Sequence, residues 1–257
     1  MLSKKSDKIK VVSIIVFIIL LVSAVLSVCI PLSYNKDKDN DNTPTQTESS
    51  IDFSTLTMAS IGDSITLGLC KGVAMSEPYP NLVKDELGLN YVYNLGIGGS
   101  TIYNKNIKSM VNRFTNIPND VDIISLMGGV NDWAQNVPLG TINDNNANTI
   151  YGALNYISTT LKSNYPNAFI FYMSPLPVSD AKLNEYSATE YSLADVSQAF
   201  KNIGAKYDIP ILDLYSLSGF EDVCNNMSAT DGVHPNQEFH KENLAPLITQ
   251  FIKDNYK

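Results

Sequence analysis

Between Phe53 and the C-terminus, short apolar stretches alternate with longer stretches that have helical periodicity. The apolar stretches are rich in β-branched and aromatic residues, which predicts strands at residues 56–61, 91–95, 121–127, 169–173 and 209–214. Helical spacing predicts helices at residues 64–73, 81–87, 148–165, 191–207 and 238–255. This alternation predicts a three-layer α/β/α domain with a mostly parallel five-stranded sheet. The predicted strands are mainly apolar and do not alternate regularly between apolar and polar residues, as expected for a sheet that is buried on both faces.

A separate apolar stretch precedes this domain and carries no charged residue between positions 11 and 30. A helix of that length spans about 30 Å, the thickness of the hydrocarbon core of a bilayer. The lysines of residues 1–10 predict a cytoplasmic N-terminus, a signal anchor at 11–30 and a catalytic domain outside the cell. Residues 31–52 are polar and predict a flexible linker to the domain at 53–257. Cleavage of a signal peptide and lipidation of Cys29 are the alternatives, and both also place the domain outside.

The charge of the chain argues against a nucleic-acid partner. The net charge is −8, and because residues 1–10 contribute +3, the remainder carries −11. An acidic domain without a stripe of basic residues repels phosphate backbones. We therefore expect a membrane-tethered protein that binds no nucleic acid, and the sequence does not predict its oligomeric state.

Four polar clusters occur where a predicted sheet of this kind places its ligands, directly after strands or near the end of the chain. They read Gly62-Asp63-Ser64-Ile65-Thr66, Asn94-Leu95-Gly96-Ile97-Gly98-Gly99-Ser100, Gly128-Gly129-Val130-Asn131-Asp132 and Asp231-Gly232-Val233-His234-Pro235. Each cluster alone is compatible with an ordinary helix cap or turn. Together they supply a hydroxyl, a glycine backbone, an amide and an acid–base pair.

The spacing of Asp231 and His234 has a chemical meaning. A carboxylate three residues before a histidine is able to hold the Nδ1–H of the ring and to leave Nε2 free as a base. Ser64, at the predicted start of a helix after the first strand, is the matching nucleophile. The second histidine of the chain, His240, lies in a charged stretch and is expected at the surface.

The four clusters, in this order, resemble the motif blocks of the SGNH hydrolases, also called the GDSL esterase/lipase superfamily. The resemblance extends over residues 56–235, and Ile65 and Thr66 are the local departure from the name-giving motif. It implies a flavodoxin-like fold and hydrolysis of acyl esters that requires no metal or organic cofactor.

The resemblance also implies a role for each site residue. Ser64 is the nucleophile, His234 the general base and Asp231 the residue that orients the ring. The backbone N–H groups of Ser64 and Gly99 and the side-chain amide of Asn131 form the oxyanion hole. Gly96 and Gly98 remain alternatives to Gly99, because they lie close to it in the same glycine-rich cluster.

The sequence predicts a class of substrate, with alternatives, rather than one compound. For a domain at the cell surface we expect acyl esters, above all O-acetyl groups on carbohydrate, with Asp63 and Trp133 as candidates for substrate contact. Trp133 is either a core aromatic or a pocket residue, and if it is exposed at the site it is suited to stacking on a sugar ring. The alternatives are a lysophospholipase or lipase, and a non-catalytic carbohydrate-binding module. Cys70 and Cys224 are the only cysteines outside the apolar stretch, and they either form a disulfide or remain thiols.

Overall fold

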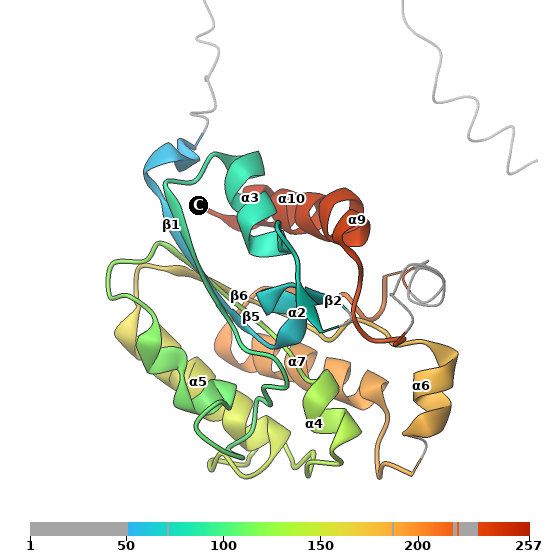
Figure 1. The fold of residues 1–257 in the computed structure, drawn as a ribbon. Helices are drawn as coiled ribbons and strands as arrows, with labels where there is room; N and C mark the ends of the chain where they lie inside the picture. The colour runs from blue at the N-terminus through green and yellow to red at the C-terminus, as the bar shows by residue number, and fades with distance from the viewer. Residues whose placement is uncertain (1–50, 71, 187, 218–219, 221–230) are drawn as a thin grey trace, which may run out of the picture. The chain divides into compact units, whose positions relative to one another are not determined.

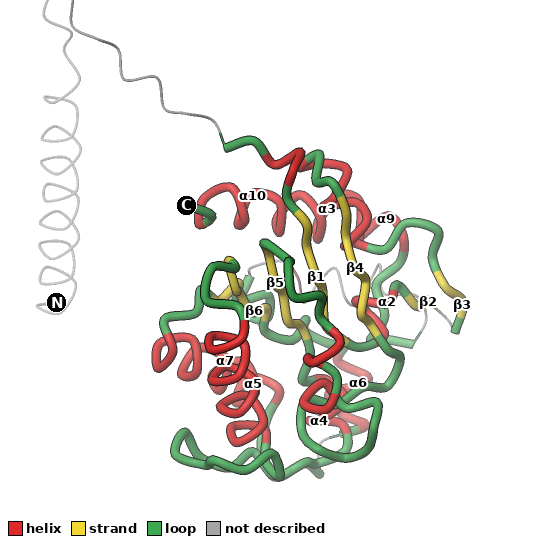
Figure 2. Tube along the Cα trace, turned by 90° about the vertical axis from the view of Figure 1, so that its left-hand side faces the viewer, coloured by secondary structure: helices red, strands yellow, loops and turns green. Residues whose placement is uncertain are grey.

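The computed structural model describes residues 51–257 of the chain except 71, 187, 218–219 and 221–230 (Figure 1). One sheet contains the strands β1 (Thr57–Gly62), β4 (Tyr91–Gly96), β5 (Ile123–Met127), β6 (Phe169–Met173) and β7 (Ile211–Leu212). The strand order is β4-β1-β5-β6-β7, and every neighbouring pair is parallel. Figure 2 shows β4, β1, β5 and β6 in this order. The predicted mostly parallel five-stranded sheet is therefore confirmed.

Several expectations concern parts of the chain that the structure does not describe. The predicted cytoplasmic segment, the signal anchor at 11–30 and nearly all of the linker at 31–52 lie outside the described residues. Within residues 51–257, where they are described, no helix is both long enough and apolar enough to cross a membrane. Cys70 is half-buried, and Cys224 falls outside the described residues, so the predicted alternatives for this pair, a disulfide or two thiols, stay open.

Helices cover both faces of the sheet. One layer contains α3 (Tyr79–Leu87) and α10 (Ala245–Asn255), and the other contains α5 (Ile150–Asn164) and α7 (Leu193–Tyr207). Figures 1 and 2 show the sheet between these two layers. Fully buried strand residues point alternately into the two layers: Met58, Ile123 and Phe171 pack with α3 and α10, whereas Ala59, Ile124 and Tyr172 pack with α5 and α7. The expected burial on both sides is therefore confirmed for β1, β5 and β6, whereas the edge strand β4 is partly exposed.

The helix predicted at residues 64–73 is wrong in its length. Helix α2 spans only Ser64–Leu67 and is followed by the short antiparallel pair β2 (Leu69–Cys70) and β3 (Val73–Ala74). The chain leaves the helix at Gly68, which has a φ of 84° and donates its N–H to the carbonyls of Ser64 and Ile65. A Cβ at Gly68 would lie 2.6 Å from the Cβ of Pro78, so close packing also requires glycine here. The apolar residues after Gly68 continue the helical pattern, and the pattern alone therefore hides the break.

His240 is buried, contrary to the expectation that it lies at the surface. The residue begins a π-helical turn, His240–Leu244, that precedes α10. The next two residues in the sequence, Lys241 and Glu242, are exposed, because neighbours along a helix face different sides. The Nδ1 atom of His240 accepts a hydrogen bond of 3.0 Å from the N–H of Tyr79. Burial lowers the pKa of His240 from its ordinary value of 6.5 to about 4, so the ring is neutral at pH 7.

We expect the free energy of unfolding to fall by about 3 kcal/mol between pH 7 and pH 4 through His240 alone, since one pKa unit corresponds to about 1.4 kcal/mol. The unfolded chain takes up a proton on this ring below about pH 6.5, whereas the folded chain takes it up only near pH 4. The stabilising contribution is therefore complete above pH 6.5 and is lost as the pH falls toward 4. Urea unfolding of the wild type and of His240→Gln at pH 7 and at pH 4.5 measures it. A difference in stability between the two proteins that is the same at both pH values would contradict the prediction.

Candidate active site

Three of the polar clusters meet at one edge of the sheet because they follow the carboxyl ends of adjacent parallel strands (Figure 1). β1 leads directly into Asp63 and Ser64, and β4 leads into a tight turn that contains Gly99. β5 leads into the short helix α4 (Val130–Ala134), which carries Asn131. Segments that are far apart in the sequence are thereby brought together.

The structure also brings His234 and Asp231 to this edge. The Nε2 atom of His234 lies 2.8 Å from the Oγ atom of Ser64. The Nδ1 atom of the same ring lies 2.7 Å from the Oδ2 atom of Asp231. The other carboxylate oxygen, Oδ1, accepts hydrogen bonds of 3.0 Å from the N–H groups of Val233 and His234. The predicted hydroxyl, imidazole and carboxylate therefore form one continuous hydrogen-bonded chain.

The pKa of Asp231 determines which groups donate and which accept in the hydrogen bonds between Ser64, His234 and Asp231. Burial alone would raise the pKa of Asp231, but hydrogen bonds from the N–H and the ring of His234 and from the N–H of Val233 lower the pKa below its ordinary value. Asp231 is therefore ionised at neutral pH and only accepts hydrogen bonds. The proton of the neutral imidazole consequently lies on Nδ1, and the lone pair of Nε2 faces the hydroxyl of Ser64. In this state the ring is able to remove a proton from the serine.

Ser64 is held at the first position of α2, directly after the end of β1. Asp63 caps the helix, and its Oδ1 atom accepts a hydrogen bond of 2.9 Å from the N–H of Ile65. Burial raises the pKa of Asp63 to about 6, although this hydrogen bond and the charges of His234 and Arg113 act in the opposite direction. The serine is thus presented by a tight strand-to-helix turn rather than by a flexible loop.

Asn131 connects the segment of Ser64 with the segment of Gly99. Its Nδ2 atom donates to the carbonyl of Ser100 at 3.0 Å and lies 3.4 Å from the Oδ2 atom of Asp63. Gly99 has a φ of 72°, which glycine adopts without strain. The N–H of Gly96 donates to the Oδ1 atom of Asn94, so Gly96 is already engaged as a donor. Three donors predicted for an oxyanion thus lie on segments that the amide of Asn131 ties together.

Two buried ionisable residues to which the sequence motifs assigned no role support these segments. Asp132 accepts hydrogen bonds from the backbone N–H groups of Ile102 at 2.9 Å and of Tyr103 at 3.1 Å, which fixes the chain after the Gly99 turn. Arg113 donates to the carbonyl of Gly62 at the end of β1. Both had a signal in the sequence: Asp132 follows Asn131 in the third cluster, and Arg113 is the only arginine of the chain.

A cavity of about 240 Å³ opens beside Ser64 and His234. The two predicted substrate-contact residues, Asp63 and Trp133, both line it. Trp133 is only 3% exposed, so its face is not open for the expected stacking on a sugar ring. Its ring packs edge-on against Tyr186, with 5.3 Å between the ring centroids. Tyr186 and Lys182 were not predicted; they come from the short helix α6 (Asp180–Glu185) and the residue that ends it.

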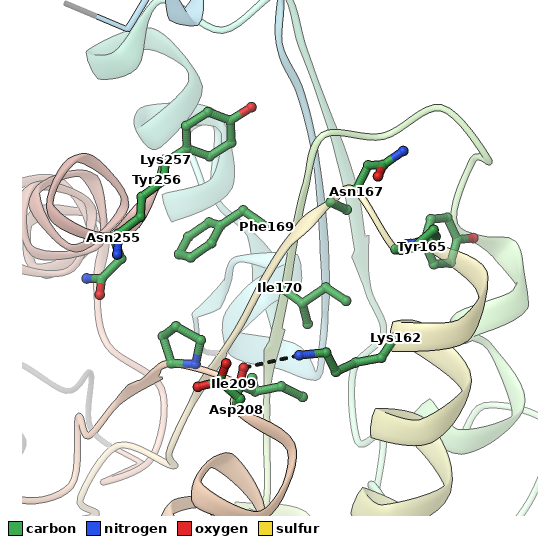
Figure 3. Close-up of a pocket in the computed structure, with 13 residues that line it drawn as sticks. Lys162, Tyr165, Asn167, Phe169, Ile170, Asp208, Ile209, Asn255, Tyr256 and Lys257 are labelled. Carbon is green, nitrogen blue, oxygen red and sulfur yellow. Dashed lines mark hydrogen bonds between the residues drawn. The ribbon is translucent and has the colours of Figure 1, made fainter.

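A larger cavity of about 410 Å³ lies at the opposite edge of the sheet (Figure 3). Its lining includes Phe169, the first residue of β6, and Ile209, which precedes β7. It therefore opens at the amino ends of the strands, and none of the predicted site residues lines it. Because sheets of this class bind ligands at the carboxyl ends of their strands, the smaller cavity is the candidate active site.

Comparison with known proteins agrees with this geometry. A model of the GDSL-like Lipase/Acylhydrolase family matches residues 60–242. A solved structure of a protein from Lactobacillus plantarum is 28% identical, with a TM-score of 0.70, over 79% of this chain and 99% of that chain.

Two further solved structures are similar in fold. A lipase/acylhydrolase from Enterococcus faecalis is 20% identical, with a TM-score of 0.59, over 79% of this chain and 98% of that chain. A carbohydrate acetylesterase family member from Sinorhizobium meliloti is 18% identical, with a TM-score of 0.55, over 77% of this chain and 99% of that chain. None of the curated proteins compared with the chain matches it.

Proposed function

The chain belongs to the GDSL-like lipase/acylhydrolase family and is a carboxylic ester hydrolase, and from this premise we propose that it removes small acyl groups, above all O-acetyl groups, from carbohydrate. The proposed catalytic residues are Ser64, His234 and Asp231. One observation carries this assignment: the Nε2 atom of His234 lies 2.8 Å from the hydroxyl oxygen of Ser64. A base at hydrogen-bond distance from a hydroxyl, with its other nitrogen held by a carboxylate, is the arrangement that activates a serine.

In the proposed acylation step, the Oγ atom of Ser64 attacks the ester carbonyl carbon while His234 Nε2 takes the hydroxyl proton. The carbonyl oxygen becomes an oxyanion, which the N–H groups of Ser64 and Gly99 and the amide of Asn131 stabilise. The negative charge of Asp231 stabilises the imidazolium that has formed. When the tetrahedral intermediate collapses, His234 returns the proton to the leaving oxygen. The alcohol departs, and the acyl group stays on Ser64 as an ester.

Deacylation repeats the same steps with water. His234 Nε2 removes a proton from a water molecule, whose oxygen attacks the acyl carbon. The second oxyanion accepts hydrogen bonds from the same donors. When this tetrahedral intermediate collapses, the bond between the acyl carbon and Ser64 Oγ breaks. The serine regains its proton from His234, and the carboxylic acid leaves. The cycle consumes one water and requires no metal or organic cofactor.

The shape and charge of the cavity support a small acyl group. Trp133 and Tyr186 line this cavity and also a neighbouring cavity of about 230 Å³, so the ring pair separates the two. Asp63, Lys182 and Asp231 place ionisable groups on the walls. A long fatty acyl chain favours an apolar groove, whereas a short acyl group fits a walled, partly charged cavity while a carbohydrate polymer remains outside it.

The proposal includes a location outside the cytoplasm, with residues 11–30 as the anchor. Its support is the sequence: twenty uncharged residues follow a basic segment, and a polar stretch leads from them into the domain. An enzyme held at the outer face of a membrane has access to cell-wall and environmental polysaccharides.

A panel of three substrates tests the proposed substrate class. We expect the exported domain to release acetate from acetylated xylan or acetylated peptidoglycan, and to release little fatty acid from lysophosphatidylcholine. Acetate and fatty acid are quantified, and the Ser64→Ala variant supplies the background. Release of fatty acid without acetate would contradict the proposal in favour of a lysophospholipase. Activity on none of the three would favour a carbohydrate-binding module instead.

A further inference from the structure

Arg113 is the only arginine among the 18 basic residues of the chain, and it is buried. It lies between two short 3-10 turns, Met110–Asn112 and Phe114–Asn116, and is only 6% exposed. Burial of a guanidinium group is costly unless its donors are satisfied. The other 17 basic residues are lysines. The single arginine therefore indicates that this position requires a planar group with several donors.

The guanidinium group of Arg113 bridges the ends of β1 and β4 and the loop that follows β4. NH1 donates to the carbonyl of Leu95 in β4 at 2.7 Å, and NH2 donates to the carbonyl of Gly62 in β1 at 3.0 Å. NH2 also donates to the Oγ atom of Ser100 at 3.0 Å, and Nε donates to the carbonyl of Lys108 at 2.7 Å. Within the described part of the chain, no carboxylate forms a salt bridge with this group. Its donors therefore bind three backbone carbonyls and one hydroxyl group, and hold them in place.

The residues that Arg113 holds are neighbours of the two backbone donors proposed for the oxyanion hole. Gly62 precedes Ser64 by two positions, and Ser100 directly follows Gly99. One rigid group thus connects the peptide segment of Ser64 with that of Gly99. A donor stabilises an oxyanion well only at about 2.7–3.1 Å from it, and a displacement of about 1 Å reduces the rate about a hundredfold.

We propose that Arg113 is a positioning residue of the oxyanion hole, which fixes the N–H groups of Ser64 and Gly99 relative to each other. This inference rests on the proposed function, because it assigns a role in the same reaction. The planar fork is what matters, rather than the positive charge alone. A lysine keeps the charge but has a single nitrogen, which is unable to reach two strand ends and a loop at once.

The test compares Arg113→Lys and Arg113→Met with Asn112→Ala. Asn112 is the matched control: it is adjacent, exposed, and donates to Asn104 and to the carbonyl of Asn106 in the same loop, but it does not bridge the strand ends. kcat and KM for p-nitrophenyl acetate are measured per active site, counted by titration with a fluorophosphonate, so that unfolded protein does not contribute. We expect kcat of Arg113→Lys to fall about 10–100-fold while KM stays within about twofold. Asn112→Ala should remain within about twofold of the wild type in both constants.

A second readout reports on the oxyanion hole itself. A trifluoromethyl ketone forms a tetrahedral adduct with an active serine, and its inhibition constant in Arg113→Lys should weaken in parallel with kcat/KM. A wild-type kcat per active site in Arg113→Lys would overturn the inference. A raised KM with unchanged kcat would also overturn it, because this pattern indicates a role in substrate binding.

Two further variants extend the test. Ser100→Ala applies if the Arg113 variants fail to fold, and Ser64→Ala shows whether the proposed function itself is wrong. Ser100→Ala removes one acceptor of the guanidinium with little change in volume, and should lower kcat by about threefold or more with unchanged KM. An unchanged kcat in Ser100→Ala would overturn the inference. If Ser64→Ala retains activity, the proposed function itself fails. If Ser64→Ala is inactive but Arg113→Lys is normal, only the role of Arg113 fails.

Discussion

Ser64→Ala should lower kcat/KM for p-nitrophenyl acetate by roughly 10⁵-fold or more, because loss of the nucleophile removes the covalent pathway altogether. The hydroxyl of Ser64 lies 2.8 Å from His234 Nε2, and alanine leaves the imidazole without a group to activate. Ser64 is 7% exposed and its side chain is small, so the substitution should leave the fold intact. Initial rates of p-nitrophenol release, together with the thermal unfolding temperature, measure both effects.

A second serine supplies the control for this prediction. Ser125 is fully buried in β5, and its hydroxyl donates to the Oγ atom of Ser60 at 3.1 Å rather than to the imidazole of His234. Ser125→Ala should keep kcat/KM within a few-fold of the wild type, while its stability falls by about 1 kcal/mol for the lost hydrogen bond. Hydrolysis that persists in Ser64→Ala at a rate near that of Ser125→Ala would disprove the assignment of the nucleophile.

The sequence was most informative where function and topology coincide. In a parallel sheet the carboxyl ends of the strands share one edge, so polar residues after strands meet in space even when they are far apart in the chain. Ser64 and Asn131 follow β1 and β5, which are adjacent strands. Asp231 and His234 are close in sequence, so their contact depends on one turn of chain. These positions could be predicted without knowledge of side-chain packing.

The parts that escaped prediction depend on tertiary contacts. Gly68 ends α2 because of its positive φ and its contact with Pro78, and neither is visible in an apolar pattern. His240 is buried because its side of the helical turn faces the interior, where the N–H of Tyr79 donates to it. Charged neighbours in the sequence indicate an exposed segment, but they do not show which side each residue faces.

Arg113 and Tyr186 lie near the candidate site, and they also escaped prediction because their positions depend on tertiary contacts. The sequence marks Arg113 only by the absence of any other arginine, and its acceptors lie in β1, in β4 and in the loop. Tyr186 enters the cavity from the end of α6, a short helix without a strong periodic signal, and meets Trp133 there. A motif identifies the reacting groups, whereas the residues that position them and shape the cavity emerge from the fold.

One of the two amide protons of Asn131 already forms a hydrogen bond within the protein. Nδ2 donates to the carbonyl of Ser100 at 3.0 Å, and this bond orients the amide plane. Nδ2 also donates to the Oδ2 atom of Asp63 at 3.4 Å, which is a long and therefore weak hydrogen bond. Asn131 and Asp63 both line the cavity, so an oxyanion that forms beside Ser64 should replace Asp63 as the acceptor of this second amide proton.

Asn131→Ala should therefore lower kcat about 10²–10³-fold and leave KM within about threefold, because the amide gains its full partner only when the carbonyl oxygen becomes an anion. Asn131→Asp, which has the same shape but no donor, should lose at least as much, since its charge would also repel the oxyanion. Gln135→Ala is the control: it removes an amide directly after α4 that is exposed and contacts Lys105 instead of the cavity, and it should stay within about twofold of the wild type. Steady-state kinetics with p-nitrophenyl acetate separate the two constants. A raised KM at constant kcat would assign Asn131 to binding of the ground state and would remove it from the oxyanion hole.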